Sequence, residues 1–398
     1  MSAFDPTSPA FRPETGLVIS GRDTLAQKGF VNPPIVRGST VLYPTAEDLR
    51  EHRGEFQYGR HGTPTTRALQ DALKTLEGPQ CAGVALAPSG LAAISTALLA
   101  VLKAGDHLLV SDNIYRPTRA FCDGMLARYG VETTYFDPLA VSDIAALFRP
   151  NTRAVMLEAP GSQTFEMPDI PAIAAIAHAR GVLVLDDNTW ATPLYRRALE
   201  QGVDISIMAA TKYIGGHSDI MFGTIAANAA TWPRIVDAAR QLGVCAGPDD
   251  VFLALRGLRT LAIRLAQHHR SGLEIANWLA ARPEVARVLH PALPDDPGHA
   301  IWRRDFKGAS GLFSIVLKPV ATRAVDAMLD TLKLFGMGYS WGGFESLAIP
   351  FDCASYRTAT TWAPEGPALR IHIGLEDIED LKADLARGFD ALNAAARG

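Results

Sequence analysis

Between residues 61 and 250, short apolar runs alternate with longer amphipathic stretches. Seven runs are expected strands: GVALAP, HLLVSD, ETTYFD, RAVMLEAP, GVLVLDD, ISIMAATK and FGTIAAN. Helix-like stretches separate several of them; residues 65–78, 89–105 and 169–181 each end at a glycine, as helix C-termini often do. Continuous apolar strands alternating with helices predict an α/β domain whose seven-stranded, mostly parallel sheet is covered on both faces.

The remaining segments follow different patterns. The first 60 residues are rich in Pro, Gly and Thr without a helical period, which predicts an extended arm. After residue 250, a long helical pattern leads to expected strands at 311–318 and 368–376 and a closing helix at 376–395. A chain of 398 residues exceeds one ordinary core. The predicted division is an arm (1–60), an α/β domain (61–250) and a C-terminal α+β domain (251–398).

Composition excludes several classes of protein. The net charge is −4 with no long run of Lys or Arg, so a nucleic-acid-binding face is not expected. The N-terminus lacks the apolar stretch of an export signal, and the longest apolar run, 91–102, is too short to span a bilayer. The four cysteines are far apart, and His268 and His269 are adjacent, so no metal site is expected. A soluble, cytoplasmic protein is predicted.

Ligands of open parallel sheets bind beyond the carboxyl ends of the strands, so residues there are candidates. Ser89-Gly90-Leu91 follows the first strand and opens a helix, whose free N–H groups favour a phosphate. A glycine at such a turn is more often plain turn geometry. Asp186 and Asp187 end the fifth strand, where a carboxylate needs a cation or donor. A salt bridge to a helix is the alternative there.

Lys212 ends the sixth run, among small residues and without an acidic neighbour. Desolvation there would lower the pKa of its amine, which could then form a Schiff base. A phosphate cradle, a strand-end carboxylate and such a lysine are together what pyridoxal phosphate requires. Tyr115, just after another strand, is the candidate for an aromatic ring stacked on that cofactor.

Motifs along nearly the whole chain resemble the Cys/Met-metabolism pyridoxal-phosphate enzymes: YGRHGTPT, SGLAA, NIYRPT, EAPGS, DDNTWATP, AATKYIGGHSD, RGLRTL, HPALP, SWGGFES and RIHIGLED. DNTWA, AATKY-x-x-GHSD, YSWGG-x-ES and R-x-HIGLED resemble the bacterial cystathionine β-lyase branch. The resemblance implies the type I, aspartate aminotransferase-like fold and α,β-elimination of L-cystathionine to L-homocysteine, pyruvate and ammonia, a transsulfuration step of methionine biosynthesis. A γ-lyase or γ-synthase, a broad cysteine-S-conjugate β-lyase and a non-catalytic binder are the alternatives.

The resemblance also implies roles for cofactor-binding residues. Lys212 would hold the cofactor and act as a catalytic base, Asp187 would pair with the pyridinium, and Tyr115 would stack on the ring and act as a second catalytic residue. Gly90 and Leu91 would bind the phosphate through their backbones, and Thr211 through its hydroxyl. Ser162 occupies a cofactor-contacting position where many relatives have asparagine.

The resemblance implies that other residues act on the substrate or across a subunit interface. Arg370 would clamp the substrate α-carboxylate, with Ser340 and Trp341 lining the same pocket. Tyr58 and Arg60 would reach the phosphate and substrate of a neighbouring subunit, so a homotetramer of two active dimers is expected. Besides Ser162, two departures from the family pattern are Ala209, where relatives outside the β-lyase branch commonly have serine, and His61, where some β-lyases have arginine.

Overall fold

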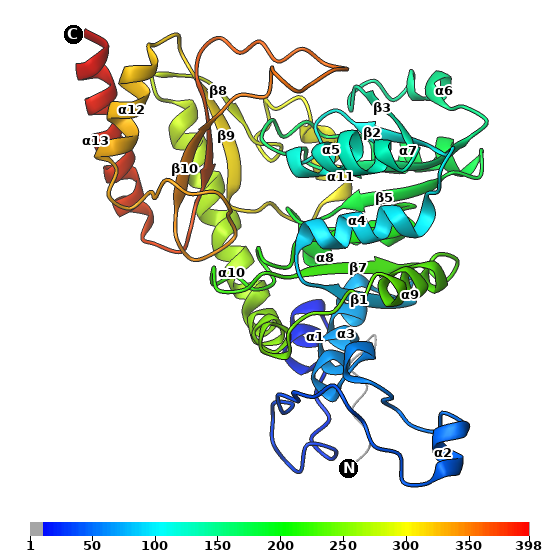
Figure 1. Cartoon of the computed structure of the whole chain (residues 1–398). Helices are drawn as coiled ribbons and strands as arrows, with labels where there is room; N and C mark the ends of the chain where they lie inside the picture. The colour runs from blue at the N-terminus through cyan, green and yellow to red at the C-terminus, as the bar shows by residue number, and fades with distance from the viewer. Residues whose placement is uncertain (1–10, 398) are drawn as a thin grey trace.

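The computed structural model describes residues 11–397 (Figure 1). Its larger domain contains a sheet with strand order β1-β7-β6-β5-β4-β2-β3. The strands are β1 (Gly83–Ala87), β2 (His107–Ser111), β3 (Glu132–Phe136), β4 (Thr152–Glu158), β5 (Leu183–Asp187), β6 (Ile205–Met208) and β7 (Gly223–Ala227). The pairs from β3 through β6 are parallel, and β7 pairs antiparallel with β6 and with β1. The predicted seven-stranded, mostly parallel sheet is confirmed.

Helices cover both faces of this sheet (Figure 1). On one face lie α4 (Gly90–Val101), α5 (Arg116–Phe121) and α9 (Trp232–Gln241); on the other lie α3 (Pro64–Glu77), α7 (Ile170–His178) and the start of α10 (Pro248–Ala280). Neighbouring strand residues divide between the two cores: Val184 packs on the α3 side and Leu185 on the α4 side. Strands buried on both faces have no polar alternation, which is why they appear in the sequence as continuous apolar runs.

Two of the three predicted glycine stops are confirmed. Helix α3 ends at Gly78, and turns after α7 continue to Gly181, whose φ is +67°. The stretch 89–105 is different, because its helix ends at Val101 and Leu102 is already extended. Gly105, with φ +86°, instead supports the turn that leads into β2.

The smaller domain follows the long helix α10, which runs from the larger domain toward the C-terminal one (Figure 1). Its antiparallel sheet has the order β10-β11-β9-β8. The elements are β8 (Val285–Leu289), β9 (Leu312–Leu317), β10 (Leu347–Phe351), β11 (Ala368–His372), α12 (Thr322–Thr331) and α13 (Ile378–Arg397). The two predicted strands are β9 and β11, at the centre of the sheet. The unpredicted β8 and β10 are edge strands: β8 is largely exposed, and β10 contains Pro350, which an edge tolerates.

Short elements complete the described chain. They are α1 (Pro13–Ile19), α2 (Ala46–Arg50), η1 (Gly59–His61), η2 (Cys122–Leu126), α6 (Ile144–Leu147), α8 (Thr192–Tyr195), η3 (Ala198–Gln201) and α11 (His299–Asp305). The arm predicted without helical period thus contains α1 and α2; α1 begins with a proline, and the Thr45 hydroxyl caps α2. None of the helices within residues 11–397 is long and apolar enough to cross a membrane.

Candidate active site

Lys212 lies in a turn after β6 and not at a strand end, so that detail of the prediction is wrong. The chain leaves the sheet because the Ala209 N–H donates to the Thr189 hydroxyl over 2.8 Å. The Gly216 N–H then donates to the Lys212 carbonyl over 2.7 Å and closes the turn. The side chain of Lys212 is therefore directed by two local hydrogen bonds that β-strand periodicity does not reveal.

Asp186 and Asp187, the last residues of β5, have different partners. Asp186 is fully buried, and its Oδ2 lies 2.9 Å from Nη1 of Arg196 in an ion pair. Asp187 Oδ1 accepts hydrogen bonds from the Thr189 N–H and hydroxyl, and Oδ2 has no hydrogen-bond partner within the described residues. Burial raises the pKa of Asp187, opposed by Thr189 and then by the charge of Lys212. Asp186 matches the salt-bridge alternative, whereas Asp187 has a carboxylate oxygen available.

The amine of Lys212 contacts a segment of the smaller domain. Its Nζ donates to Ser340 Oγ over 2.6 Å and lies 5.2 Å from the Trp341 ring centroid. Burial, and then the charge of Arg370, lower the pKa of Lys212 to about 8, and Asp187 opposes this shift. An amine with that pKa has a substantial neutral fraction near neutral pH and can act as a nucleophile or base.

The segment that begins at Ser340 has a strained backbone. Ser340 has φ +113°, unusual for a residue with a side chain, and its carbonyl accepts a hydrogen bond from Arg370 Nη2 over 3.1 Å. Gly342 has φ +85°, and a Cβ there would lie 3.0 Å from Lys212 Cβ. The segment thus packs against the lysine at a distance that only glycine allows.

Arg370 lies in the middle of β11, in a partly buried position. Burial lowers the pKa of its guanidinium to about 10. No carboxylate of the described chain forms an ion pair with Arg370, in contrast to many of the other arginines. A buried guanidinium that lacks an acidic partner can bind a ligand carboxylate with two parallel hydrogen bonds.

The start of α4 faces the turn that precedes Lys212. The Ser89 hydroxyl accepts a hydrogen bond from the Ala92 N–H. The N–H groups of Gly90 and Leu91 precede the first intrahelical hydrogen bond, so the helix itself gives them no acceptor. A Cβ on Gly90 would lie 2.5 Å from the Ala209 Cβ, so the helix end meets the turn closely. Thr211 already donates its hydroxyl proton to the Phe222 carbonyl, and must exchange that bond to serve a phosphate.

Tyr115 precedes α5, and its side chain is 41% exposed. Its backbone N–H donates to Glu158 Oε2 over 2.7 Å, and Glu158 pairs with Asp187 in the β4–β5 register. Burial, followed by the charges of Asp187 and Glu158, raises the pKa of the phenol. Glu158 was not predicted as a site residue. The sequence signal that could have indicated it is an acidic residue at the end of an apolar run. Ser162 donates its N–H to the Asn113 carbonyl, near the start of α5.

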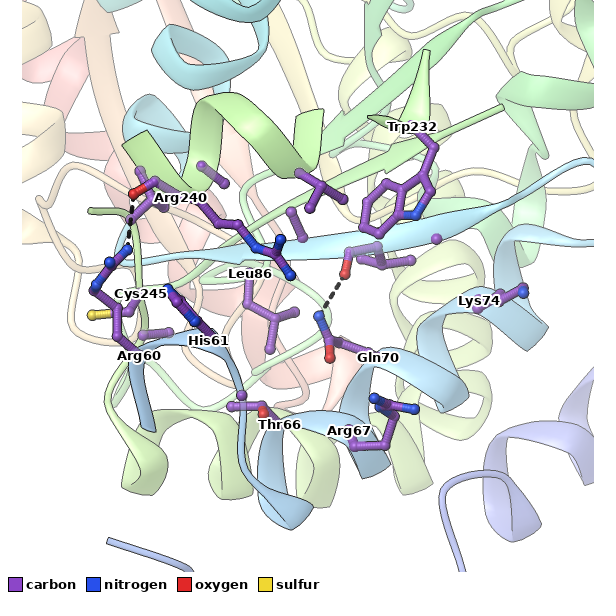
Figure 2. Close-up of a pocket in the computed structure, with 18 of the residues that line it drawn as sticks. Arg60, His61, Thr66, Arg67, Gln70, Lys74, Leu86, Trp232, Arg240 and Cys245 are labelled. Atoms are coloured by element: carbon purple, nitrogen blue, oxygen red, sulfur yellow. Dashed lines mark hydrogen bonds between the residues drawn. The ribbon is translucent and has the colours of Figure 1, made fainter. Parts of the chain in front are cut away.

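Tyr58 and Arg60 are not brought to the Lys212 cluster. Arg60 lines a separate cavity of about 460 Å³, together with His61, Arg240 and residues of α3 (Figure 2), and Tyr58 immediately precedes η1. Arg60 Nη1 donates to the Arg240 carbonyl over 2.8 Å, and the guanidinium lies 6.0 Å from the Tyr58 ring centroid. Tyr58 also forms an isolated β-bridge with Thr40, so the partners of these two residues lie in the arm, on η1 and on α9.

The cluster around Lys212 fits pyridoxal phosphate. The free Oδ2 of Asp187 can accept a ring N–H, and the α4 N-terminus offers N–H donors to a phosphate. Lys212 supplies an amine of lowered pKa for the aldehyde, and Tyr115 supplies a partly exposed ring near Asp187 and Arg370. The described residues therefore contain a partner for the ring nitrogen, the phosphate and the aldehyde of the cofactor.

Comparisons with known proteins agree with this geometry. The sequence model of the family described as Cys/Met metabolism PLP-dependent enzyme matches residues 14–390. A putative cystathionine β-lyase of Rhizobium johnstonii is 54% identical over 96% of each chain. A cystathionine β-lyase of Salmonella typhimurium is 46% identical over 94% of this chain and 98% of its own length. The crystal structure of metB from Corynebacterium glutamicum superposes with a TM-score of 0.89 at 30% identity, covering 98% of this chain and all of that one.

Proposed function

This chain belongs to the Cys/Met metabolism PLP-dependent enzymes, and we propose that it is a cystathionine β-lyase that cleaves L-cystathionine, with consumption of one water, to L-homocysteine, pyruvate and ammonia. The observation that carries the proposal is the Lys212 amine, with its pKa lowered to about 8, held between Asp187 and the Ser340 and Arg370 of the other domain. The identity to β-lyases along nearly the whole chain supports the choice of this reaction over γ-elimination.

Pyridoxal phosphate supplies an aldehyde that bonds to amines and a conjugated ring that accepts electrons. We assign its binding to Lys212 at the aldehyde, to Asp187 at the ring nitrogen, and to Gly90 and Leu91 at the phosphate. Asp187 keeps its charge most readily opposite a protonated ring nitrogen, since burial alone raises the pKa of this carboxyl. Tyr115 is assigned to the ring face, and Thr211 and Ser162 to secondary contacts.

Arg370 binds the substrate α-carboxylate and thereby turns the α-hydrogen toward Lys212. The neutral Lys212 amine takes this proton, because its lowered pKa makes the neutral form far more accessible near neutral pH than in an ordinary lysine. Ser340 Oγ, 2.6 Å from Nζ, holds the amine on the side of Trp341 while the carboxylate docks. As the β-carbon–sulfur bond breaks, Lys212 or Tyr115 gives a proton to the sulfur of the departing homocysteine.

A second copy of the chain completes this site in our proposal. Arg60 lines the cavity of Figure 2, and Tyr58 lies just before it in the chain; both would contact phosphate and substrate of a neighbouring subunit. Apolar side chains of the preceding segment, such as Leu25 and Leu42, are more than 80% exposed. We therefore propose a homotetramer of two active dimers, and we place it in the cytoplasm. Its contacting arm is the segment 1–60, of which residues 1–10 lie outside the described structure, ahead of domains 61–250 and 251–398.

The test incubates the purified holoenzyme with L-cystathionine and identifies the keto acid. We expect pyruvate from the wild type, no measurable turnover from Lys212→Ala, and full turnover from Lys318→Ala, which removes an exposed lysine. A 2-oxobutyrate product would replace the proposal with γ-elimination. Wild-type pyruvate release by Lys212→Ala would remove the assigned base. Parallel assays with cystine decide between cystathionine and a broader range of cysteine S-conjugates.

A further inference from the structure

Two buried histidines lie behind Lys212. His372 ends β11 and His268 lies on α10; their exposed fractions are 1% and 0%, and their ring centroids are 5.3 Å apart. The ring of Tyr213, the residue after Lys212, lies 5.1 Å from His268 and 6.1 Å from His372. The two histidine rings therefore pack beneath the turn that carries Lys212.

The contacts of His372 define its tautomer. The Gly342 N–H points at Nε2 over 3.1 Å, so Nε2 carries a lone pair and the ring proton is on Nδ1. The Gly343 carbonyl, 3.3 Å from the same nitrogen, is then a contact without a hydrogen bond. Nδ1 is buried and has no hydrogen-bond partner in the described chain. His372 thus presents a donor that lacks an acceptor.

The contacts of His268 leave it with an unpaired acceptor instead of an unpaired donor. Its Nδ1 lies 2.8 Å from the Ile373 carbonyl, which can only accept, so this nitrogen carries the proton. Nε2 therefore carries a lone pair, and it is buried without a hydrogen-bond partner among the described residues. A buried donor or acceptor left unpaired costs on the order of 1–3 kcal/mol. The two deficits are complementary and belong to neighbouring rings.

We propose that one buried water bridges His372 Nδ1–H to His268 Nε2, and that this relay positions the Ser340–Gly342 segment against Lys212. The relay runs from the Gly342 N–H through both imidazoles to the Ile373 carbonyl and so ties this segment to α10. The inference rests on the proposed function, since Ser340 and Arg370 are the groups that the segment positions. Both histidines are positioning residues that act through Gly342.

The surroundings of His268 and His372 favour uncharged imidazole rings. Burial lowers the pKa of His268 to about 4 and that of His372 well below its usual value, and the charges of Arg370 and Lys212 act on His372 in the same direction. A proton added to either ring would remove a lone pair that the relay uses. It would also place a cation near Lys212 and Arg370, whose positive charges already disfavour protonation of His372.

Asparagine and glutamine cut the relay selectively, because the asparagine amide overlays Nδ1 of histidine and the glutamine amide overlays Nε2. His372→Gln keeps an acceptor for Gly342 but offers no donor to His268. His268→Asn keeps a donor for Ile373 but offers no acceptor to His372. We expect each variant to lower kcat/KM about tenfold and to shift the acid limb of its pH profile, and the double variant to lose about tenfold rather than about a hundredfold.

His290→Asn is the matched control. His290 is equally buried and also has an unpartnered Nε2, but its ring contacts Trp190 and Phe313 instead of the Lys212 turn. This variant should lower the melting temperature without moving the pH profile. Additive losses in the double variant, or a pH limb that stays in place while the two single variants melt earlier, would show two independent structural histidines and overturn the relay.

Nitrogen NMR of the histidine-labelled holoenzyme separates this inference from the proposed function. We expect protonated Nδ1 in both rings, and a His268 Nε2 signal that moves toward a free lone pair in His372→Gln but less in His372→Asn, which keeps the donor. If these signals behave so and no pyruvate forms, the relay stands and the proposed reaction fails. If pyruvate forms and the His268 signal ignores His372→Gln, the relay is wrong.

Discussion

Two cationic regions of this chain differ in the solvent exposure of their charged groups. Lys212 and Arg370 lie between the domains, and burial lowers the pKa of both. Arg60 and Arg240 instead line an open cavity between η1, α3 and α9, where Arg60 donates a hydrogen bond to the Arg240 carbonyl (Figure 2). The first region contains a carboxylate with a free oxygen, Asp187, whereas the second opens to solvent.

The difference separates two kinds of chemistry. A desolvated amine can lose its proton at neutral pH, so the Lys212 region can carry a bond-breaking step. Solvated guanidinium groups keep their protons and can only attract anions. The cavity beside Arg60 therefore suits recognition of a phosphate or carboxylate, which our proposal assigns to the site of a second copy.

The largest effect should come from Asp187→Asn, which leaves the first region with cations alone. We expect kcat/KM for cystathionine to fall about 10³-fold, because the buried electrostatic partner of the cofactor ring is lost. The neighbouring Asp186→Asn is the control, since it breaks the ion pair with Arg196 and should cost about 3–5 kcal/mol of stability. Thermal melting and steady-state kinetics of both variants distinguish the outcomes; equal kcat/KM losses in the two would contradict the assigned roles.

Arg370→Lys should produce the next largest effect. Lysine keeps the positive charge but cannot make two parallel hydrogen bonds to a carboxylate, nor the bond to the Ser340 carbonyl in the same geometry. We expect KM for cystathionine to rise about 30-fold, with a smaller change in kcat. Arg287→Lys, at the exposed ion pair with Glu365 on β8, should leave both constants unchanged. An unaltered KM in Arg370→Lys would place the carboxylate elsewhere.

Arg60→Ala tests the second region and should have a smaller effect, about tenfold in kcat/KM, because a solvated charge contributes less. The sharper experiment mixes Arg60→Ala with Lys212→Ala under conditions that exchange subunits. If Arg60 serves a neighbour, one site of each mixed dimer carries both defects and the other carries neither, so activity rises above that of either parent. If mixing does not raise the activity, Arg60 acts in the site of its own chain.

Much of the fold was predictable from the sequence because strands buried on both faces leave continuous apolar runs. The same reasoning failed at the edges of the smaller sheet, where β8 is exposed and β10 contains a proline. The C-terminal end of α4 was also misplaced, because the turn after it uses Gly105 without continuing the helix.

The candidate site divides in the same way. Lys212, Asp187 and Gly90 follow apolar runs, so their meeting at one sheet edge could be expected. Arg370 and Ser340 come from a different domain, and only the resemblance to a family indicated them. Thr189 and His372 carried no local signal, since their roles depend on hydrogen bonds to Ala209 and Gly342 that form only after folding.

The smallest expected effect comes from Lys212→Met. This variant reports on the burial of the Lys212 amine, which distinguishes the first region from the second. In the cofactor-free chain, the pKa of Lys212 is about 8 when folded and 10.5 as the unperturbed value, so the unfolded state binds more protons between these pH values. The charge therefore destabilises the fold below about pH 8, and this cost disappears as pH rises toward 10.5. Lys212→Met should raise the melting temperature at pH 7 by about 2–4 °C, and the gain should shrink as pH rises through that window. Calorimetry of both proteins without cofactor, with the exposed Lys318→Met as control, tests this; a gain that is absent at pH 7 or constant with pH would mean that Lys212 is as well solvated as the cations beside Arg60.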